Sequence, residues 1–167
     1  MYTPAELADQ VRAYADTLIS TLERFPDDGF NAAAADGGWS GALVAEHLQR
    51  VDKGILKMVT GDEHRAVDRP VDQKVQAIHE SFLESPKKYT AFGNIIPKGR
   101  LSTVAQAIEE LKTIYDQLIQ ALPKLDLAQE VTSFEHPLFG PLTNYEWVHF
   151  LIIHGKRHLR QLDALLA

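Results

Sequence analysis

The chain has 167 residues, of which 45% are hydrophobic and 24% are charged, a balance typical of a globular protein that buries a core. Its net charge of −6, from 17 basic and 23 acidic side chains, argues against general nucleic-acid binding, which needs a basic surface to neutralise phosphates. The absence of cysteine excludes disulfides, protein thiolate nucleophiles and cysteine-rich zinc sites.

The N-terminal part of the sequence predicts two amphipathic helices. The first follows Thr3, whose hydroxyl can cap it, with proline at the first helical position and Glu6 completing a capping box. Apolar residues then recur at intervals of three and four as far as Phe25, and a Pro-Asp-Asp-Gly turn ends the helix. The second helix is expected between Ser40, its predicted cap, and Gly61.

The C-terminal part predicts two more helices. One is expected from Ser102 to Leu122, because Pro123 cannot continue a helix. The last follows Thr143, which forms a second capping box with Glu146. One face of this last helix has the spacing of a buried stripe and consists of Trp147, Leu151, His154, His158, Gln161 and Leu165.

A long connection, residues 61–101, separates the second and third predicted helices. It is too long for a structureless loop, so we expect a short helix at 72–83 and extended or turning chain at 89–98. Short connections join the other helix pairs, which favours an all-α four-helix bundle with one long crossover between helices two and three, in one domain spanning 1–167. No leader-like segment opens the chain and no apolar run reaches the roughly 20 residues that cross a bilayer, so we expect a cytoplasmic protein without membrane partners.

The last helix presents two histidines, His154 and His158, one turn apart on its apolar face. Ligands at i and i+4 project closely enough to hold one ion, and neutral imidazole suits zinc, nickel, copper and ferrous iron. His47 lies on the apolar stripe of the second helix and is the candidate third ligand. This arrangement predicts a three-histidine site with an open coordination position, and hydrogen-bonded core histidines are the alternative.

The other four histidines are not expected to bind a metal. His149 is turned away from the ligand face; with Glu146 it has the Glu-x-x-His spacing of di-iron bundles, but the sequence has no second copy of that motif. His136 precedes a proline in a loop, where a turn or packing role is expected. His64 and His79 lie in the crossover and are expected to be solvated.

No motif assigns catalytic or cofactor-binding residues. The sequence has no nucleophile elbow and no glycine-rich phosphate loop. Packing in the core is the expected role of four aromatic residues, Trp39, Phe139, Tyr145 and Trp147. Basic residues of the last helix could meet a substrate carboxylate, but a solvated basic face is expected of Lys156, Arg157 and Arg160.

Two parts of the sequence resemble the DinB/YfiT-like superfamily, in particular a branch of uncharacterised bacterial proteins. The C-terminal part reads His136-Pro137-Leu138-Phe139-Gly140-Pro141-Leu142-Thr143, then Glu146-Trp147, then His154-x-x-x-His158-Leu159-Arg160-Gln161-Leu162. The N-terminal part, which resembles the start of the family's second helix, reads Trp39-Ser40 and then Glu46-His47-Leu48. The crossover between them shows no such resemblance.

This resemblance implies a fold, a ligand set and a range of activities. The family has a four-helix bundle of up-down-down-up topology, and its metal site takes one histidine from the second helix and two from the fourth. These positions correspond to His47, His154 and His158. A divalent ion, zinc or nickel, and homodimers are implied. Some relatives are S-transferases that use a low-molecular-weight thiol such as bacillithiol or mycothiol, and others have no known activity.

Two functional hypotheses follow. A metal with an open position can lower the pKa of a thiol and present it as thiolate, so the first hypothesis is a metal-dependent S-transferase acting on small electrophiles. Because the chain has no cysteine, the sulfur would come from a small molecule. The alternative is a non-catalytic metal- or ligand-binding bundle with a structural or stress-associated role.

Overall fold

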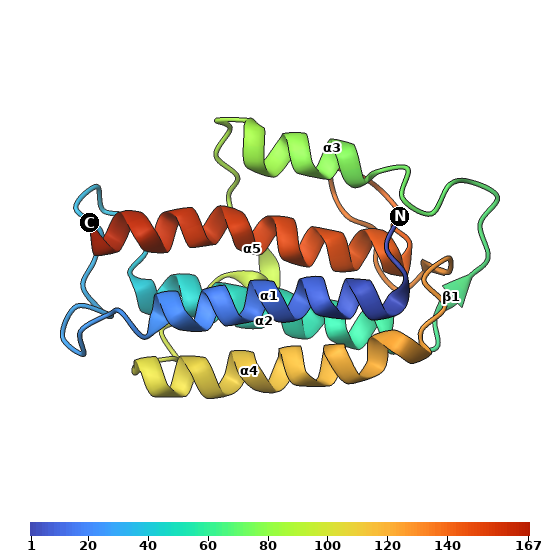
Figure 1. The fold of residues 1–167 in the computed structure, drawn as a ribbon. Helices are drawn as coiled ribbons and strands as arrows, with labels where there is room; N and C mark the ends of the chain where they lie inside the picture. Colours follow the sequence, from blue (N-terminus) through green and yellow to red (C-terminus); the bar gives the residue numbers. More distant parts are fainter.

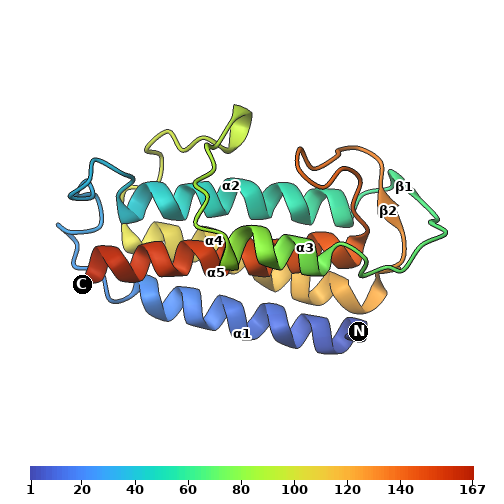
Figure 2. The ribbon, with the colours of Figure 1, turned by 90° about the horizontal axis from the view of Figure 1, so that it is seen from above.

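The computed structural model describes residues 1–167 and is built around four long helices. These are α1 (Pro4–Leu22), α2 (Gly41–Val59), α4 (Val104–Ala121) and α5 (Asn144–Leu166). Helices α1 and α5 run in one direction and α2 and α4 in the other (Figures 1 and 2), and α1 and α2 each pack against both α4 and α5. The predicted up-down-down-up four-helix bundle is confirmed.

Side-chain caps start three of these helices where the sequence predicts. The Thr3 hydroxyl accepts a hydrogen bond from the Glu6 N–H at 3.3 Å, and the Glu6 carboxylate accepts one from the Thr3 N–H at 2.8 Å. Thr143 and Glu146 form the same reciprocal pair before α5. The Ser40 hydroxyl caps α2. Each cap satisfies backbone donors that would otherwise lack a partner.

The boundaries of α4 differ slightly from the prediction. Its cap is Thr103, one residue later than Ser102, and the Thr103 hydroxyl accepts from the Gln106 N–H at 3.2 Å. The α-helix ends at Ala121, and the chain continues through the 3₁₀ turn η3 (Leu122–Lys124), which contains the proline. A proline fits this tighter turn because the helical hydrogen bond that it cannot donate is no longer required.

The crossover between α2 and α4 has local structure where expected. It contains α3 (Val75–His79), which continues into the π-helical turn η1 (Glu80–Glu84), and the 3₁₀ turn η2 (Gly93–Ile95). Helix α3 and η1 pack along α5 outside the four-helix bundle, and η2 packs against α2 (Figures 1 and 2). The crossover therefore covers one side of the bundle.

One pair of strands was not predicted. Strand β1 (His64–Arg65) pairs antiparallel with strand β2 (Glu130–Val131), so the start of the crossover is joined to the segment before α5. Strands of two residues are too short to show an alternating hydrophobic pattern. This short ribbon therefore has no signal in the sequence.

The core contains a polar cluster with one residue from each long helix. The Tyr115 hydroxyl of α4 lies 2.7 Å from the Asp52 carboxyl of α2 and 3.4 Å from the Tyr14 hydroxyl of α1. Gly155 of α5 completes the cluster, since a β-carbon there would lie 1.9 Å from the Tyr14 oxygen. Burial raises the pKa of Asp52 to about 8, so this carboxyl is largely protonated at neutral pH.

Apolar side chains from all four long helices surround this cluster, and Phe82 of the crossover joins them. None of the helices is both long and apolar enough to cross a membrane.

Candidate metal centre

Three histidine rings converge between α2 and α5. The Nε2 atom of His154 lies 3.3 Å from Nε2 of His47 and 3.1 Å from Nε2 of His158. One ligand atom from each of the three residues lies within 4.8 Å of the others. Zinc–nitrogen bonds of about 2.0–2.1 Å in tetrahedral geometry require nitrogen atoms about 3.3 Å apart. The spacing of the Nε2 atoms fits one ion among them.

Hydrogen bonds orient two of the three rings. The Nδ1–H of His47 donates to the carbonyl oxygen of Ile95 at 2.8 Å, and the Nδ1–H of His158 donates to the side-chain oxygen of Gln161 at 3.0 Å. Because these oxygen atoms only accept, the proton of each neutral ring lies on Nδ1. The lone pair of each Nε2 then points toward the other histidines, the arrangement that metal-binding imidazoles adopt.

The third ring, that of His154, is held by aromatic contacts. Phe150 stacks on it with centroids 5.2 Å apart, and the edge of Phe82 approaches it at 5.8 Å. Its Nδ1 atom is buried and has no hydrogen-bond partner. Packing therefore holds this ring, and its Nε2 lies within hydrogen-bonding distance of both other histidines.

Burial keeps all three rings neutral. It lowers the pKa of His47, lowers that of His158 to about 3, and places that of His154 well below the usual value. The nearby imidazoles lower the pKa values of His154 and His158 further. Neutral imidazole is the form of histidine that binds metals.

A cavity of about 270 Å³ opens onto the three histidines. Trp39 lies on its wall with its ring centroid 5.0 Å from that of His47. Phe92 of the crossover also lines it. The cavity gives a bound ion an accessible side, as a site with an open coordination position requires.

A buried carboxylate, Glu46, holds the crossover on α2 beside this centre. It accepts hydrogen bonds from the backbone N–H groups of Lys98 and Arg100 at 3.0 and 2.8 Å and from the Arg50 side chain at 2.6 Å. Burial alone would raise the pKa of Glu46, but these hydrogen bonds outweigh it and the pKa is lowered. The ionised carboxylate thus fixes the segment that follows Ile95.

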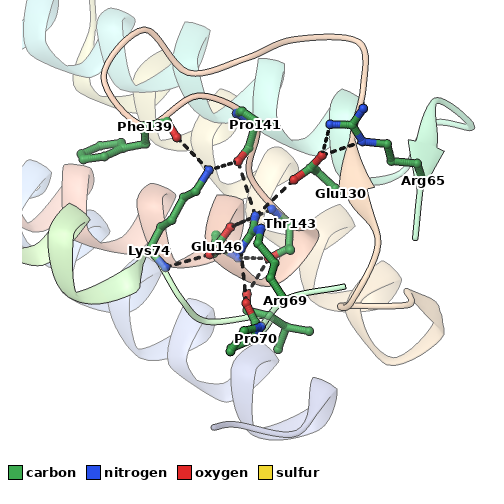
Figure 3. A network of polar contacts seen from close by, with 10 residues as sticks. Arg65, Arg69, Pro70, Lys74, Glu130, Phe139, Pro141, Thr143 and Glu146 are labelled. Carbon is green, nitrogen blue, oxygen red and sulfur yellow. Dashed lines mark hydrogen bonds and ion pairs between the residues drawn. The ribbon is translucent and has the colours of Figure 1, made fainter. Parts of the chain in front are cut away.

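A second buried network ties the crossover to the start of α5 (Figure 3). The Glu146 carboxylate accepts from both terminal nitrogens of Arg69 at 2.8 Å and from the Lys74 N–H at 2.8 Å. Glu130 accepts from Arg65 at 2.7 Å and from Arg69 at 3.3 Å. Hydrogen bonding to Glu146 is the largest effect that raises the pKa of Arg69. With its oxygens engaged in this way, Glu146 does not serve a di-iron centre.

His149 points away from the three converging rings, as expected from its helical position. Its ring lies 4.5 Å from that of Tyr145 and 6.0 Å from that of Tyr2. Burial lowers its pKa to about 4. Packing is confirmed for the aromatic residues Tyr145 and Trp147, which are both buried.

The prediction of solvated histidines in the crossover is wrong for His64. This ring is half-buried in β1, and its Nε2 lies 3.0 Å from the side-chain oxygen of Asn144 at the start of α5. The partner is 80 residues away in the sequence, so no local pattern indicates it. His79 remains partly exposed and lies 3.2 Å from the Glu84 carboxylate.

The predicted solvated basic face of the last helix is wrong for Arg157, which is half-buried, whereas Arg160 is exposed as predicted. Both arginines also bind the crossover, since their guanidinium groups donate at 2.7–3.0 Å to the carbonyl oxygens of Phe82, Leu83 and Lys87. Lys156 is exposed. The two arginines are therefore engaged in holding η1 and the following turn on α5.

Comparison with known proteins identifies the family. A family model described as the DinB superfamily matches residues 9–162. The chain belongs to the DinB superfamily. This DinB superfamily member is 27% identical over 144 residues to the uncharacterized protein YuaE of Bacillus subtilis (strain 168), with 86% of this chain and 87% of YuaE covered.

A solved structure shares the four-helix bundle fold. The crystal structure of TT2238, a four-helix bundle protein, aligns with a TM-score of 0.61 over 97% of this chain and 99% of that one. The two sequences are 18% identical, so this likeness shows the fold alone.

Proposed function

We propose that this chain binds one divalent transition metal through the Nε2 atoms of His47, His154 and His158. The observation that supports the proposal is the convergence of three neutral imidazoles, two of which have Nδ1 held by an oxygen acceptor. Three nitrogen donors with an accessible side suit a zinc or nickel ion. Hydrogen-bonded core histidines are the alternative, because the same Nε2 atoms also lie within hydrogen-bonding distance of one another.

We further propose that the chain is a metal-dependent S-transferase that joins a low-molecular-weight thiol to a small electrophile. A bound divalent ion would lower the pKa of the thiol. The three neutral histidines would leave the positive charge of the ion uncompensated. This charge favours an anionic sulfur in the adjoining cavity. The S–H proton passes to solvent, a sulfur–carbon bond forms, and the leaving group departs with its bonding electron pair.

Metal binding is tested on protein purified without a histidine tag. Elemental analysis should give about one zinc or nickel ion per chain, and titration of chelator-treated protein should restore it. His158→Ala should lose this stoichiometric binding. His149→Ala is the matched control, because it removes a half-buried histidine from the same helix away from the three rings. Full metal content in His158→Ala would overturn the proposed ligand set.

Transfer is tested by mixing the metal-loaded protein with bacillithiol or mycothiol and an electrophile such as 1-chloro-2,4-dinitrobenzene. Conjugate should form faster than in the uncatalysed reaction, and both chelation and His158→Ala should remove the difference. Metal binding without any acceleration over a broad panel of thiols and electrophiles would count against the transferase.

One observation favours a second candidate, a metal-binding bundle without catalysis. The buried carboxylates Glu46, Glu130 and Glu146 are all engaged by arginine side chains or backbone N–H groups, so none is free as a general base. Such a protein would be stabilised by the ion, because a ligand bound only to the folded state raises the melting temperature. Such a protein would show the higher melting temperature with metal but no turnover.

Self-association into a homodimer stays a prediction from the family resemblance. Light scattering on the metal-free and metal-loaded protein tests it directly, and a monomer mass in both states would exclude it.

A further inference from the structure

Two adjoining cavities lie beside the three histidines. The smaller one, described above, touches all three, and the larger one has a volume of about 610 Å³ and touches His154. Their shared wall is formed by Phe92, Ile95, His136, Pro137, Phe150 and His154. Sites for small organic molecules have volumes of roughly 300–1,000 Å³. The larger cavity therefore has room for such a molecule next to the candidate metal centre.

Apolar side chains line the larger cavity and its rim. The inner wall is formed by Val51, Ile55, Met58, Trp147 and Phe150. Phe92, Phe134 and Leu138 are large apolar residues that stay 52%, 43% and 50% exposed, and all three line one or both cavities. Charged side chains also border the larger cavity, at Arg50, Lys57, Asp62 and Glu63. Exposed apolar groups gathered on a cavity are typical of a ligand site.

His136 is a polar group in the wall between the cavities. Its Nδ1 accepts a hydrogen bond from the backbone N–H of Leu138 at 3.1 Å. Because Nδ1 is the acceptor, the proton of the neutral ring lies on Nε2. Burial lowers the pKa of His136 to about 4, so the ring is neutral at pH 7. The protein provides no acceptor for the Nε2–H group, since the bond to Leu138 is the side chain's single hydrogen bond.

A rigid turn holds this ring. His136 and Gly140 exchange backbone hydrogen bonds of 2.9 and 2.7 Å, and Gly140 has φ +66°, a conformation that favours glycine. The Lys74 ammonium donates to the carbonyl oxygens of Phe139 and Pro141, and the Lys74 N–H donates to Glu146 (Figure 3). The network around Glu146 thus fixes the position of His136, and a donor fixed before binding costs less entropy to use.

The ring also packs on aromatic neighbours. Its centroid lies 4.8 Å from those of Phe139 and Phe150 and 5.8 Å from that of Trp147. Phe150 in turn stacks on His154. Phe150 therefore contacts both the ring that carries the unpartnered donor and one of the candidate metal ligands.

We propose that the larger cavity binds an apolar organic molecule, of the size of a two-ring aromatic compound, whose carbonyl or similar oxygen accepts a hydrogen bond from Nε2–H of His136. This proposal deepens the proposed transferase function, because it names the class of the electrophile. It rests on that function only for the reaction at the histidine centre. The binding itself requires no ion. His136 is a specificity-determining residue in this assignment, and the apolar walls supply most of the affinity.

The test uses two probes with the same rings, 2-acetylnaphthalene and 2-ethylnaphthalene, of which the first alone has an acceptor oxygen. Their affinities are measured by fluorescence titration of the wild-type protein and of His136→Phe, which keeps an aromatic ring and removes the donor. The wild type should bind the ketone about three- to tenfold more tightly than the hydrocarbon, the usual value of one net hydrogen bond. His136→Phe should bind both alike, whereas the control His149→Phe should keep the preference.

Equal affinity of the wild type for both probes, or binding of neither, would overturn the proposal. A second measurement needs no variant: nitrogen-15 NMR of the wild-type histidines should show His136 with its proton on Nε2, and a proton on Nδ1 would contradict it. Repeating the titration in His158→Ala separates this proposal from metal binding. Preference for the ketone should persist there even when the ion is lost.

Discussion

The Nδ1 atom of His47 lies 2.8 Å from the carbonyl oxygen of Ile95, which is 48 residues further along the chain. This contact makes the orientation of one candidate ligand depend on the crossover and not on α2 alone. His158 is oriented by Gln161 of α5 itself, and His154 packs against Phe150 of α5 and Phe82 of the crossover. The crossover is in turn held on α2 by Glu46, which bonds the backbone of Lys98 and Arg100.

Replacing Glu46 should therefore weaken metal binding without touching a ligand. Glu46→Gln keeps the shape of the side chain but turns one acceptor into a donor that faces backbone N–H groups. The Ile95 carbonyl should then move more freely, and metal affinity should fall by about tenfold or more, as for other groups that orient a ligand. Competition with a chromophoric chelator measures this.

Glu110→Gln is the matched control for that experiment. Its carboxylate accepts from Gln49 at an exposed position between α2 and α4, so metal affinity should stay at the wild-type value. Unchanged affinity in a folded Glu46→Gln protein would show that the Ile95 contact does not matter for the ion.

The sequence predicts the parts of this molecule that depend on neighbours along the chain. The caps Thr3, Ser40 and Thr143 need residues three positions away, and the apolar stripe brings His154 and His158 to one face. The family resemblance adds the topology. Contacts between distant segments leave no periodic signal, which is why the partner of His64 was missed.

The same reason explains why the sequence does not predict the contacts of the buried carboxylates. Glu46 has its Arg50 partner one turn away, but its backbone partners are 52 and 54 residues distant. Arg157 likewise has the helical position of a surface residue, because its hydrogen-bond partner lies in the distant crossover. The convergence of the three histidines was predictable because each lies on an apolar stripe. Ile95 and Phe82, which contact His47 and His154, lie in the crossover and were not predictable.

Gly155→Ala should destabilise the fold although alanine is the better helix former. A β-carbon at this position would meet the Tyr14 hydroxyl oxygen at 1.9 Å and its ring carbon at 2.1 Å. The helices must separate or the tyrosine must leave its place, which should cost about 1–3 kcal/mol or more in the free energy of unfolding. Urea denaturation followed by circular dichroism measures the change.

Gly54→Ala provides the opposite case in α2. No atom lies within 4 Å of a β-carbon built there, so helix propensity should dominate and stabilise the protein by up to about 1 kcal/mol. A destabilised Gly54→Ala or a neutral Gly155→Ala would contradict the packing described here.

Arg69→Ala should be strongly destabilising. It leaves the fully buried carboxylate of Glu146 without its bidentate partner and removes a hydrogen bond from Glu130. Breaking a buried pair by deleting one member costs about 3–5 kcal/mol. Thermal and urea unfolding both report it.

The comparison for Arg69→Ala is Arg24→Ala. Arg24 pairs with Asp163 at 2.8 Å, but both side chains are more than half exposed. Exposed pairs contribute little to stability, so this substitution should leave the unfolding midpoint nearly unchanged. Similar losses in both variants would show that burial of the network is not what makes Arg69 important.

Asp52→Asn should change how stability depends on pH. An aspartate in the unfolded chain ionises near pH 4, whereas burial raises the pKa of Asp52 in the folded protein to about 8. Between these values the folded protein keeps a proton that the unfolded chain has released. The free energy of unfolding therefore falls as pH rises through this window, by up to about 1.4 kcal/mol per pH unit from this group.

Asparagine does not titrate, so the variant should gain stability relative to the wild type as pH is raised from 5 to 8. Urea unfolding at each pH, in the presence of a chelator, measures the difference. The control Asp116→Asn, at an exposed position, should differ from the wild type by a constant free energy of unfolding over the same pH range. A constant offset for Asp52→Asn as well would mean that Asp52 is ionised in the folded protein throughout.

The contact between Tyr14 and Gly155 has a consequence for how sequences of this family can diverge. Gly155 directly follows one candidate ligand and precedes the other by three residues, and the Tyr14 hydroxyl occupies the space that a side chain there would need. A relative with a larger residue at the position of Gly155 is expected to have a shorter one at that of Tyr14. The two positions should therefore covary, whereas Gly54 imposes no such packing constraint on a neighbouring helix.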